Sequence, residues 1–180
     1  YLNEHPGDLE SFYGLAMAYA RKQDIPRAIS YARQAIDGGL PFARFLAGPR
    51  DLLKPLTDSD EFKLLAEKHA VQLLHGPMLG CVTDSSAKFW FRTETESSVV
   101  VRVVNSGPRE SLQKTAKGMT DSQRDFTVVL TVEGLKPNSS YDYEVWVEGE
   151  SKPRNGRFST FPMPGKPAKF QIGFGGGAGY

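Results

Sequence analysis

The stretch LKPNSSYDYEV (residues 135–145) indicates the fold of the C-terminal half of the chain. Leu135, Pro137 and Tyr141 have the spacing of a tyrosine corner, in which a tyrosine hydroxyl forms a hydrogen bond with the backbone a few residues upstream. The corner occurs in antiparallel β-sandwiches, where it fixes the start of a strand. We therefore interpret Tyr141, Leu135 and Pro137 as structural residues and not as catalytic ones.

Short strands are expected on both sides of this corner. The runs with strand composition are MLGCVT (78–83), AKFWFRT (87–93), SVVVRVVN (98–105), RDFTVVLTV (124–132), SYDYEVWVEG (140–149) and NGRFSTF (155–161). In the fourth run Phe126, Val128, Leu130 and Val132 alternate with Thr127, Val129 and Thr131. One face of this strand should therefore be buried. Residues 76–162 are predicted to form a fibronectin type III-like sandwich, in which Trp90 and Trp146 are interpreted as packing residues. Both fall on the face opposite the main apolar residues of their strands, where exposure would indicate an interface.

Helical periodicity dominates residues 1–75. Asp8 is positioned to cap a first helix, while Asp24 and Pro26 are positioned to open a second one that ends at Gly38-Gly39. The apolar residues of both helices recur at helical spacing, which predicts a helical hairpin.

The hairpin resembles a tetratricopeptide repeat. The residues at the positions of the repeat signature are Phe12, Leu15, Ala16, Tyr19, Ala28 and Ala35, counted from Leu9. An ordinary helical hairpin is the alternative. The next stretch, PFARFLAGPRDLLKPL, is interrupted by Gly48-Pro49 and Pro55.

A further helix is expected to follow and to act as a terminal cap. Asp58 and Glu61 should begin this helix, which would carry Phe62, Leu65, Ala66 and Leu73. Because stacked repeats bury their faces against one another, the resemblance implies more repeats before Tyr1, and protein partners that dock on them.

Composition and charge exclude several classes of protein. Of the 180 residues, 39% are hydrophobic and 24% charged, as in globular domains. The net charge is +1 and the basic residues are scattered, so a nucleic-acid surface is not expected. No run is long enough to span a membrane, and no targeting signal is seen, so localisation stays open. Cys81, the single cysteine, cannot form an internal disulfide and is expected to be a small buried strand residue.

The last residues, KFQIGFGGGAGY (169–180), place a strand-like run before a series of glycines. Gly173, Gly175 and Ala178 satisfy the dinucleotide-binding pattern, but the following helix and second strand that this site needs are not in the sequence. A P-loop is excluded, because no Gly-Lys-Ser/Thr follows the glycines. Residues 163–180 are interpreted as a linker and the first strand of a further domain, with Phe170, Ile172 and Phe174 as its apolar residues.

Three runs on either side of that linker are similar to the N-terminal region of PhoD-like phosphatases. They are HGPMLGCVTDSSAKFWFRT (75–93), TVVLTVEGLKPNSSYDYEVWVEG (127–149) and GRFSTFPMPGKPAKFQIGFGGGAGY (156–180). The resemblance implies a sandwich that leads into a calcineurin-like α/β metallophosphoesterase domain, truncated here after one strand. It also implies divalent or ferric metal ions and calcium in a full-length relative, a phosphate ester as substrate, and an extracellular or periplasmic location.

The position at which the family commonly has a cysteine near its metal is glycine in this chain, at Gly177. Without a thiolate, carboxylate and imidazole ligands would favour harder divalent ions, so the identity of the metal stays open. No catalytic or metal-binding residue is assigned. His5, His69 and His75 are interpreted as a helix-entry, a helix-surface and a boundary residue, respectively, and Asn138, in a glycosylation-like Asn-Ser-Ser, as a turn residue.

Two functions of different class follow. In the first, the chain is the non-catalytic front end of a PhoD-like phosphatase or phosphodiesterase, in which the helices dock partners and the sandwich supports the catalytic domain. In the second, the chain is an interaction scaffold of helical repeat and sandwich without any enzymatic activity. The sequence that follows Tyr180 would distinguish them.

Overall fold

A computed structural model describes residues 4–106, 112–169, 173 and 175. Within these residues, five α-helices are followed by two antiparallel β-sheets, in agreement with the predicted order of helices and then sandwich. The predicted strand residues Phe170, Ile172 and Phe174, and Gly177, lie outside the described residues. No helix in the described part of the chain is both long and apolar enough to cross a membrane.

Helices α1 (Leu9–Arg21) and α2 (Ile25–Asp37) form the predicted hairpin. The Asp8 carboxylate caps α1 by accepting a hydrogen bond of 2.8 Å from the Ser11 N–H, and Asp24 caps α2. Each cap satisfies one backbone donor at a helix N-terminus, which has no partner inside the helix. After α2, Gly39 has a φ of +109°, which favours glycine at this turn.

The three shorter helices differ from the prediction in detail. They are α3 (Ala43–Ala47), α4 (Arg50–Thr57) and α5 (Asp60–Glu67). Pro55 does not interrupt α4, because burial of Leu53 and Leu56 outweighs the loss of one backbone donor. The cap of α5 is Ser59, whose hydroxyl accepts from the Phe62 N–H at 3.3 Å, and not Asp58.

Seven strands form the sandwich. The three-stranded sheet has the order β1-β2-β5 and the four-stranded sheet the order β4-β3-β6-β7. Their bounds are β1 (Leu73–Gly80), β2 (Ser86–Thr93), β3 (Ser98–Asn105), β4 (Gln113–Met119), β5 (Thr127–Glu133), β6 (Ser140–Val147) and β7 (Arg154–Ser159). A short 3-10 helix, η1 (Ser122–Arg124), precedes β5. Leu73, predicted to lie on the last helix, instead begins β1 and packs in the sandwich core.

The sequence did not predict β4, which is an edge strand of the four-stranded sheet. Its residues alternate between half-buried and exposed, but the inward ones are Lys114, Ala116 and Gly118 and not large apolar residues. The two sheets approach closely at Gly118, where an added Cβ would lie 2.7 Å from Leu130 Cδ2. An edge strand of this composition has no apolar alternation to reveal it.

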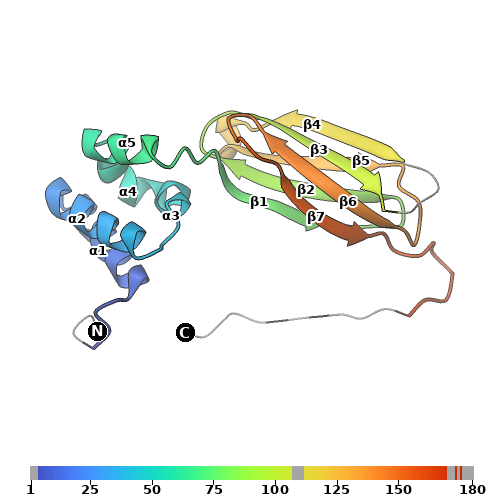
Figure 1. Ribbon diagram of the computed structural model, residues 1–180, viewed down its shortest axis with the longest axis horizontal. Coiled ribbons are helices and arrows are strands. Elements are labelled where there is room, and N and C mark those ends of the chain that lie inside the picture. Colours follow the sequence, from blue (N-terminus) through green and yellow to red (C-terminus); the bar gives the residue numbers. More distant parts are fainter. Residues whose placement is uncertain (1–3, 107–111, 170–172, 174, 176–180) are drawn as a thin grey trace.

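The helices lie at one end of the sandwich, and the chain leaves the sandwich at the other end (Figure 1). At the helical end, the Glu150 carboxylate accepts hydrogen bonds from the N–H groups of Gln72 and Leu73, at 3.3 and 3.1 Å. At the opposite end, the Phe161 N–H donates to Thr83 O, and the Asn138 N–H donates to Phe161 O. Both ends of the sandwich segment are therefore held by hydrogen bonds that join its two sheets.

Candidate functional site at the junction of the helices and the sandwich

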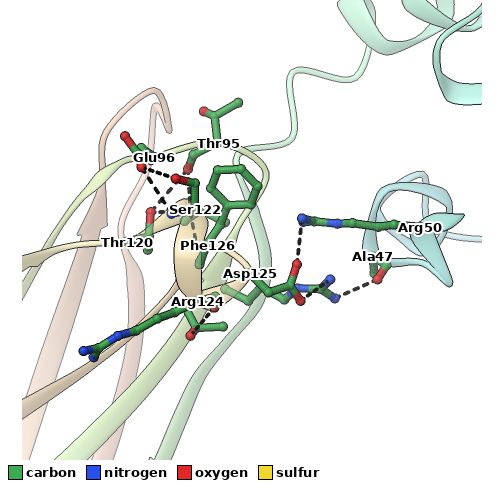
Figure 2. Close-up of polar contacts among 12 residues, drawn as sticks. Ala47, Arg50, Thr95, Glu96, Thr120, Ser122, Arg124, Asp125 and Phe126 are labelled. Carbon is green, nitrogen blue, oxygen red and sulfur yellow. Dashed lines mark hydrogen bonds and ion pairs between the residues drawn. The ribbon is translucent and has the colours of Figure 1, made fainter. Parts of the chain in front are cut away.

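Asp125 links the helices to the sandwich. It follows η1 and has a φ of +55°, in the left-handed region that aspartate tolerates better than most residues. One carboxylate oxygen lies 2.7 Å from Nη1 of Arg50 in α4, and the other lies 2.7 Å from Nη2 of Arg92 in β2. Figure 2 shows the Asp125 carboxylate facing the Arg50 guanidinium. A single acidic side chain thus binds one arginine from each part of the chain.

Arg92 also contacts the helices directly. Its Nη1 donates a hydrogen bond of 2.7 Å to the carbonyl of Ala47, the last residue of α3. The side chain is 13% exposed, so most of it is removed from water. Because the planar guanidinium has donors in a fixed arrangement, it can bind a carboxylate and a carbonyl at the same time.

The turn that carries Asp125 is held in place by Glu96. The Glu96 carboxylate accepts from the Ser122 N–H at 3.1 Å and from the Ser122 hydroxyl at 2.7 Å (Figure 2). These hydrogen bonds lower the pKa of the Glu96 carboxyl. At the other end of the turn, the Thr127 hydroxyl donates to the Arg124 carbonyl at 2.7 Å. The position of Asp125 is therefore fixed by contacts within the sandwich.

A pocket of about 360 Å³ lies beside this ion-pair cluster, between α4 and the sandwich. It is lined by Phe45, Leu46, Arg50, Asp51, Leu53, Lys54, Thr57, Asp58, Glu94 and Phe126. The Arg50 guanidinium lies over the Phe126 ring, 5.1 Å from its centroid, which adds a cation–π contact across the junction.

Glu94 is the partly buried acid of this pocket. Burial raises the pKa of its carboxyl, while Arg50 and Arg92 oppose that change. Glu94 Oε2, Arg50 Nη2 and Arg92 Nε are buried and form no hydrogen bond within the described residues. The pocket contains no histidine or cysteine, and the described residues contain no group of three or more potential metal ligands. The junction therefore offers positioning and binding of charged groups.

The predicted corner residues lie far from this junction, at the end where the chain leaves the sandwich. Tyr141 is fully buried, and its hydroxyl accepts a hydrogen bond of 2.7 Å from the upstream Lys136 N–H. The hydroxyl is therefore an acceptor for the backbone. Leu135 is buried and its N–H donates to Ser85 O, while the Pro137 carbonyl accepts from the Ser139 hydroxyl.

The six residues at the repeat positions lie in the α1–α2 hairpin. Ala16, Ala28 and Ala35 are fully buried, which allows the two helices to pack closely. Phe12 and Tyr19 are half-buried and both stack on Tyr31, with ring centroids 6.3 and 5.5 Å apart. Leu15 is also half-buried.

The cysteine and the histidines are not brought together. Cys81 is exposed and has a φ of +45°, so the prediction of a buried strand residue is wrong, because β1 ends at Gly80 and a turn follows. His69 follows α5 and stacks on Phe42, with ring centroids 4.5 Å apart. His75 lies in β1, beside Trp90, and His5 is exposed before α1.

The remaining predicted positions differ in exposure. Asn138 lies in a turn with a φ of +49°. Gly173 and Gly175 are exposed, and Gly177 is outside the described residues. Of the two tryptophans, Trp90 is half-buried and Trp146 is 39% exposed.

Sequence reasoning missed Arg50, Arg92, Glu94 and Asp125. The partners come from segments far apart in the sequence, and none of them belongs to a local motif. The one signal was the charged Arg92 directly after the aromatic run Phe89-Trp90-Phe91.

A protein-family model described as a domain of unknown function (DUF7800) matches residues 70–164. No curated protein matches the chain. Among solved structures, PhoD matches with 20% identity and a TM-score of 0.42, over 50% of this chain and 19% of the PhoD chain. The chain thus spans about a fifth of PhoD.

Two further solved structures match over about half of this chain. A redesigned β-sandwich protein matches with 15% identity and a TM-score of 0.38, over 49% of this chain and 94% of its own. The sensor domain of the anti-sigma factor RsgI4 of Pseudobacteroides cellulosolvens matches with 17% identity and a TM-score of 0.35. That match covers 56% of this chain and 97% of the sensor domain.

Proposed function

Because the chain belongs to the family described as a domain of unknown function (DUF7800), its role must be inferred from its residues, and we propose that it is the non-catalytic N-terminal part of a PhoD-like metal-dependent phosphatase or phosphodiesterase. The observation that carries the proposal is that three sequence runs resemble the N-terminal region of PhoD-like phosphatases and occur in the same order. The third run, residues 156–180, continues from the last strand of the sandwich through a proline-containing linker into the glycines.

In this proposal the sandwich supports a catalytic domain that begins after the linker. The proposal is supported by the anchoring of the chain just before the linker, where Phe161 is hydrogen-bonded to Thr83 and Asn138 in two loops of the sandwich. A domain attached after the linker would therefore begin close to a residue that is held against the sandwich. The metal ions, with a ligand set that differs from the family at Gly177, would belong to that domain.

The helices would dock protein partners as a tetratricopeptide-like unit. The close α1–α2 packing through Ala16, Ala28 and Ala35 supports this role, as does the half-buried aromatic stack of Phe12, Tyr31 and Tyr19. The Asp125 cluster would then hold the docking helices in a fixed orientation relative to the sandwich.

The test is to read the gene beyond the codon for Tyr180 and to assay its product. Gly-Asp and Gly-Asn-His motifs at strand ends, together with hydrolysis of p-nitrophenyl phosphate or its bis-ester by the full-length protein, would support the proposal. The 180-residue chain should hydrolyse neither ester when divalent metals are added. A stop codon directly after Tyr180 would instead select the interaction scaffold, and turnover by the 180-residue chain above a metal-only control would contradict its non-catalytic role.

A further inference from the structure

The outer face of the four-stranded sheet carries an exposed tryptophan among polar side chains. Trp146 of β6 pairs with Val100 of β3, and Val100 pairs with Lys117 of β4, so these three side chains form one row across the sheet. Trp146 is 39% exposed, although a buried environment is usual for so large an apolar side chain. A shallow groove of about 500 Å³ contains this row together with Ser98 and Glu148.

The next row of the same face is polar throughout. Thr115, Arg102, Glu144 and Asn155 lie side by side on β4, β3, β6 and β7, and all four are exposed. Neighbouring strands are about 4.8 Å apart and alternate residues on a strand about 7 Å apart, so this row lies within reach of a ligand stacked on Trp146.

Several of these polar groups have no partner among the residues that the structure describes. The side chains of Lys117, Arg102, Glu144 and Asn155 form no hydrogen bond or ion pair within the described residues. In contrast, Asp142, one row further from Trp146, binds Arg157 and Ser106 at 2.8 and 2.6 Å. The polar groups around the tryptophan are therefore available to a ligand.

We propose that this face binds a neutral, extended carbohydrate chain, with Trp146 as the stacking platform. An aromatic ring offers a flat apolar surface to the C–H face of a sugar ring, and the hydroxyls at the edge of the sugar both donate and accept hydrogen bonds. Glu144 would accept from such hydroxyls, and Arg102 and Lys117 would donate to them. A flat, open sheet face fits an extended chain better than a compact ligand.

Charge balance on this face favours a neutral ligand. Arg102, Lys117 and Arg157 carry three positive charges, and Asp142, Glu144 and Glu148 carry three negative ones. An anionic polymer would be attracted by the two arginines but repelled by the three carboxylates.

The same charges disfavour a dry protein interface at this face. The centre of a protein–protein interface is depleted of charged residues, because burying unpaired charges is costly. Trp146 has Lys117 in its own row and Glu144 two residues away on its strand. A hydroxyl-rich ligand can bind such groups while leaving them partly hydrated.

Binding can be followed through Trp146 itself. The chain has two tryptophans, so Trp90→Phe leaves Trp146 as the single fluorescent indole. Titration of this variant with hexasaccharides of β-1,4-linked glucose, xylose or N-acetylglucosamine should shift or quench the emission with at least one of them. Polygalacturonate, an anionic chain, should give no response at physiological ionic strength.

Affinity electrophoresis in gels containing the corresponding polysaccharides supplies the mutational test. Trp146→Ala should weaken retardation by about tenfold, since the stacking contact is lost. Glu144→Gln, an exposed substitution that leaves the fold intact, should weaken it several-fold. Val129→Ala is the matched control, because Val129 is 54% exposed on the outer face of the other sheet, and it should leave retardation unchanged.

The outcomes separate the possible occupants. Absence of a response to all three neutral glycans, or retardation that Trp146→Ala and Glu144→Gln leave unchanged, overturns the proposal. If sedimentation shows a dimer that Trp146→Ala dissociates and no glycan competes with it, the face binds a second copy instead. These measurements use the 180-residue chain alone, so their outcome does not depend on whether the proposed phosphatase role is correct.

Discussion

The guanidinium of Arg92 lies 2.7 Å from the Asp125 carboxylate, and this contact places the acid where Arg50 of the helices can also bind it. Asp125 is 55% exposed at its side chain, so solvent screening reduces the strength of both ion pairs. The Arg92 side chain, at 13% exposed, is much less screened. The junction therefore depends most on the contacts of Arg92.

Asp125→Asn should loosen the junction without disturbing the turn. Asparagine tolerates a φ of +55° as well as aspartate does, so the variant removes the charge and keeps the backbone preference. We expect a loss of about 1–2 kcal/mol in the free energy of unfolding and faster proteolysis in residues 68–72, which join the two parts. Asp60→Asn, which removes an exposed ion pair with Lys63, is the control and should change little. Equal effects of the two variants would show that Asp125 is not a coupling residue.

Tyr141→Phe should destabilise the sandwich by about 1–3 kcal/mol, because the Lys136 N–H would lose its acceptor. Chemical denaturation measures the effect. Tyr143→Phe is the matched control in the same strand, since its hydroxyl forms no hydrogen bond within the described residues. An unchanged midpoint for Tyr141→Phe would contradict the role of the corner.

Gly76→Ala should be more damaging than Gly149→Ala. Both glycines have a positive φ, +109° and +87°, so both substitutions strain the backbone. A Cβ at residue 76 would also lie 2.7 Å from the Trp90 carbonyl oxygen, whereas at residue 149 the nearest atom, Gln72 Cγ, is 3.7 Å away. We expect losses of about 2–4 and 1–2 kcal/mol respectively. Thermal unfolding of both variants checks the difference, and equal losses would argue against a close contact with Trp90.

Glu94→Gln should change how stability depends on pH. Burial raises the pKa of Glu94 from its ordinary value of 4.5, so the folded chain keeps this proton at a higher pH than the unfolded chain does. The stabilising contribution of the carboxyl is therefore complete below pH 4.5 and declines as the pH rises through the raised pKa. Relative to Glu94→Gln, the wild type should lose stability across that range in urea titrations at a series of pH values.

Glu96→Gln should change the pH dependence of folding stability in the opposite direction, and Glu96 lies in the same loop as Glu94. Hydrogen bonds from Ser122 lower the pKa of Glu96, so its contribution is present above pH 4.5 and is lost as the pH falls through the lowered value. If both variants showed the same trend with pH, the assignment of the Glu94 effect to burial would be wrong.

Features set by neighbours in the sequence could be predicted, and features set by distant partners could not. Asp8 caps α1 through a hydrogen bond to a residue three positions away, which the local sequence contains. Alternation likewise revealed β5, where Leu130 and Val132 are buried. In contrast, the pairing of Asp125 with Arg50 depends on the packing of helices against the sandwich, which no local pattern encodes. The location of Cys81 was misjudged because the end of β1 at Gly80 is set by the turn that follows.

The opposite placement of the helices and the linker makes the sandwich a spacer of defined length. Strand β2 runs from Ser86 to Thr93, at the helical end, and eight residues at about 3.3 Å each span about 26 Å. The helices are held through Asp125 at one end, and Phe161 is hydrogen-bonded to Thr83 and Asn138 at the other, so the sandwich separates the two attachment points. Any partner captured by the helices would therefore be held about one strand length from the residues at which the chain leaves the sandwich.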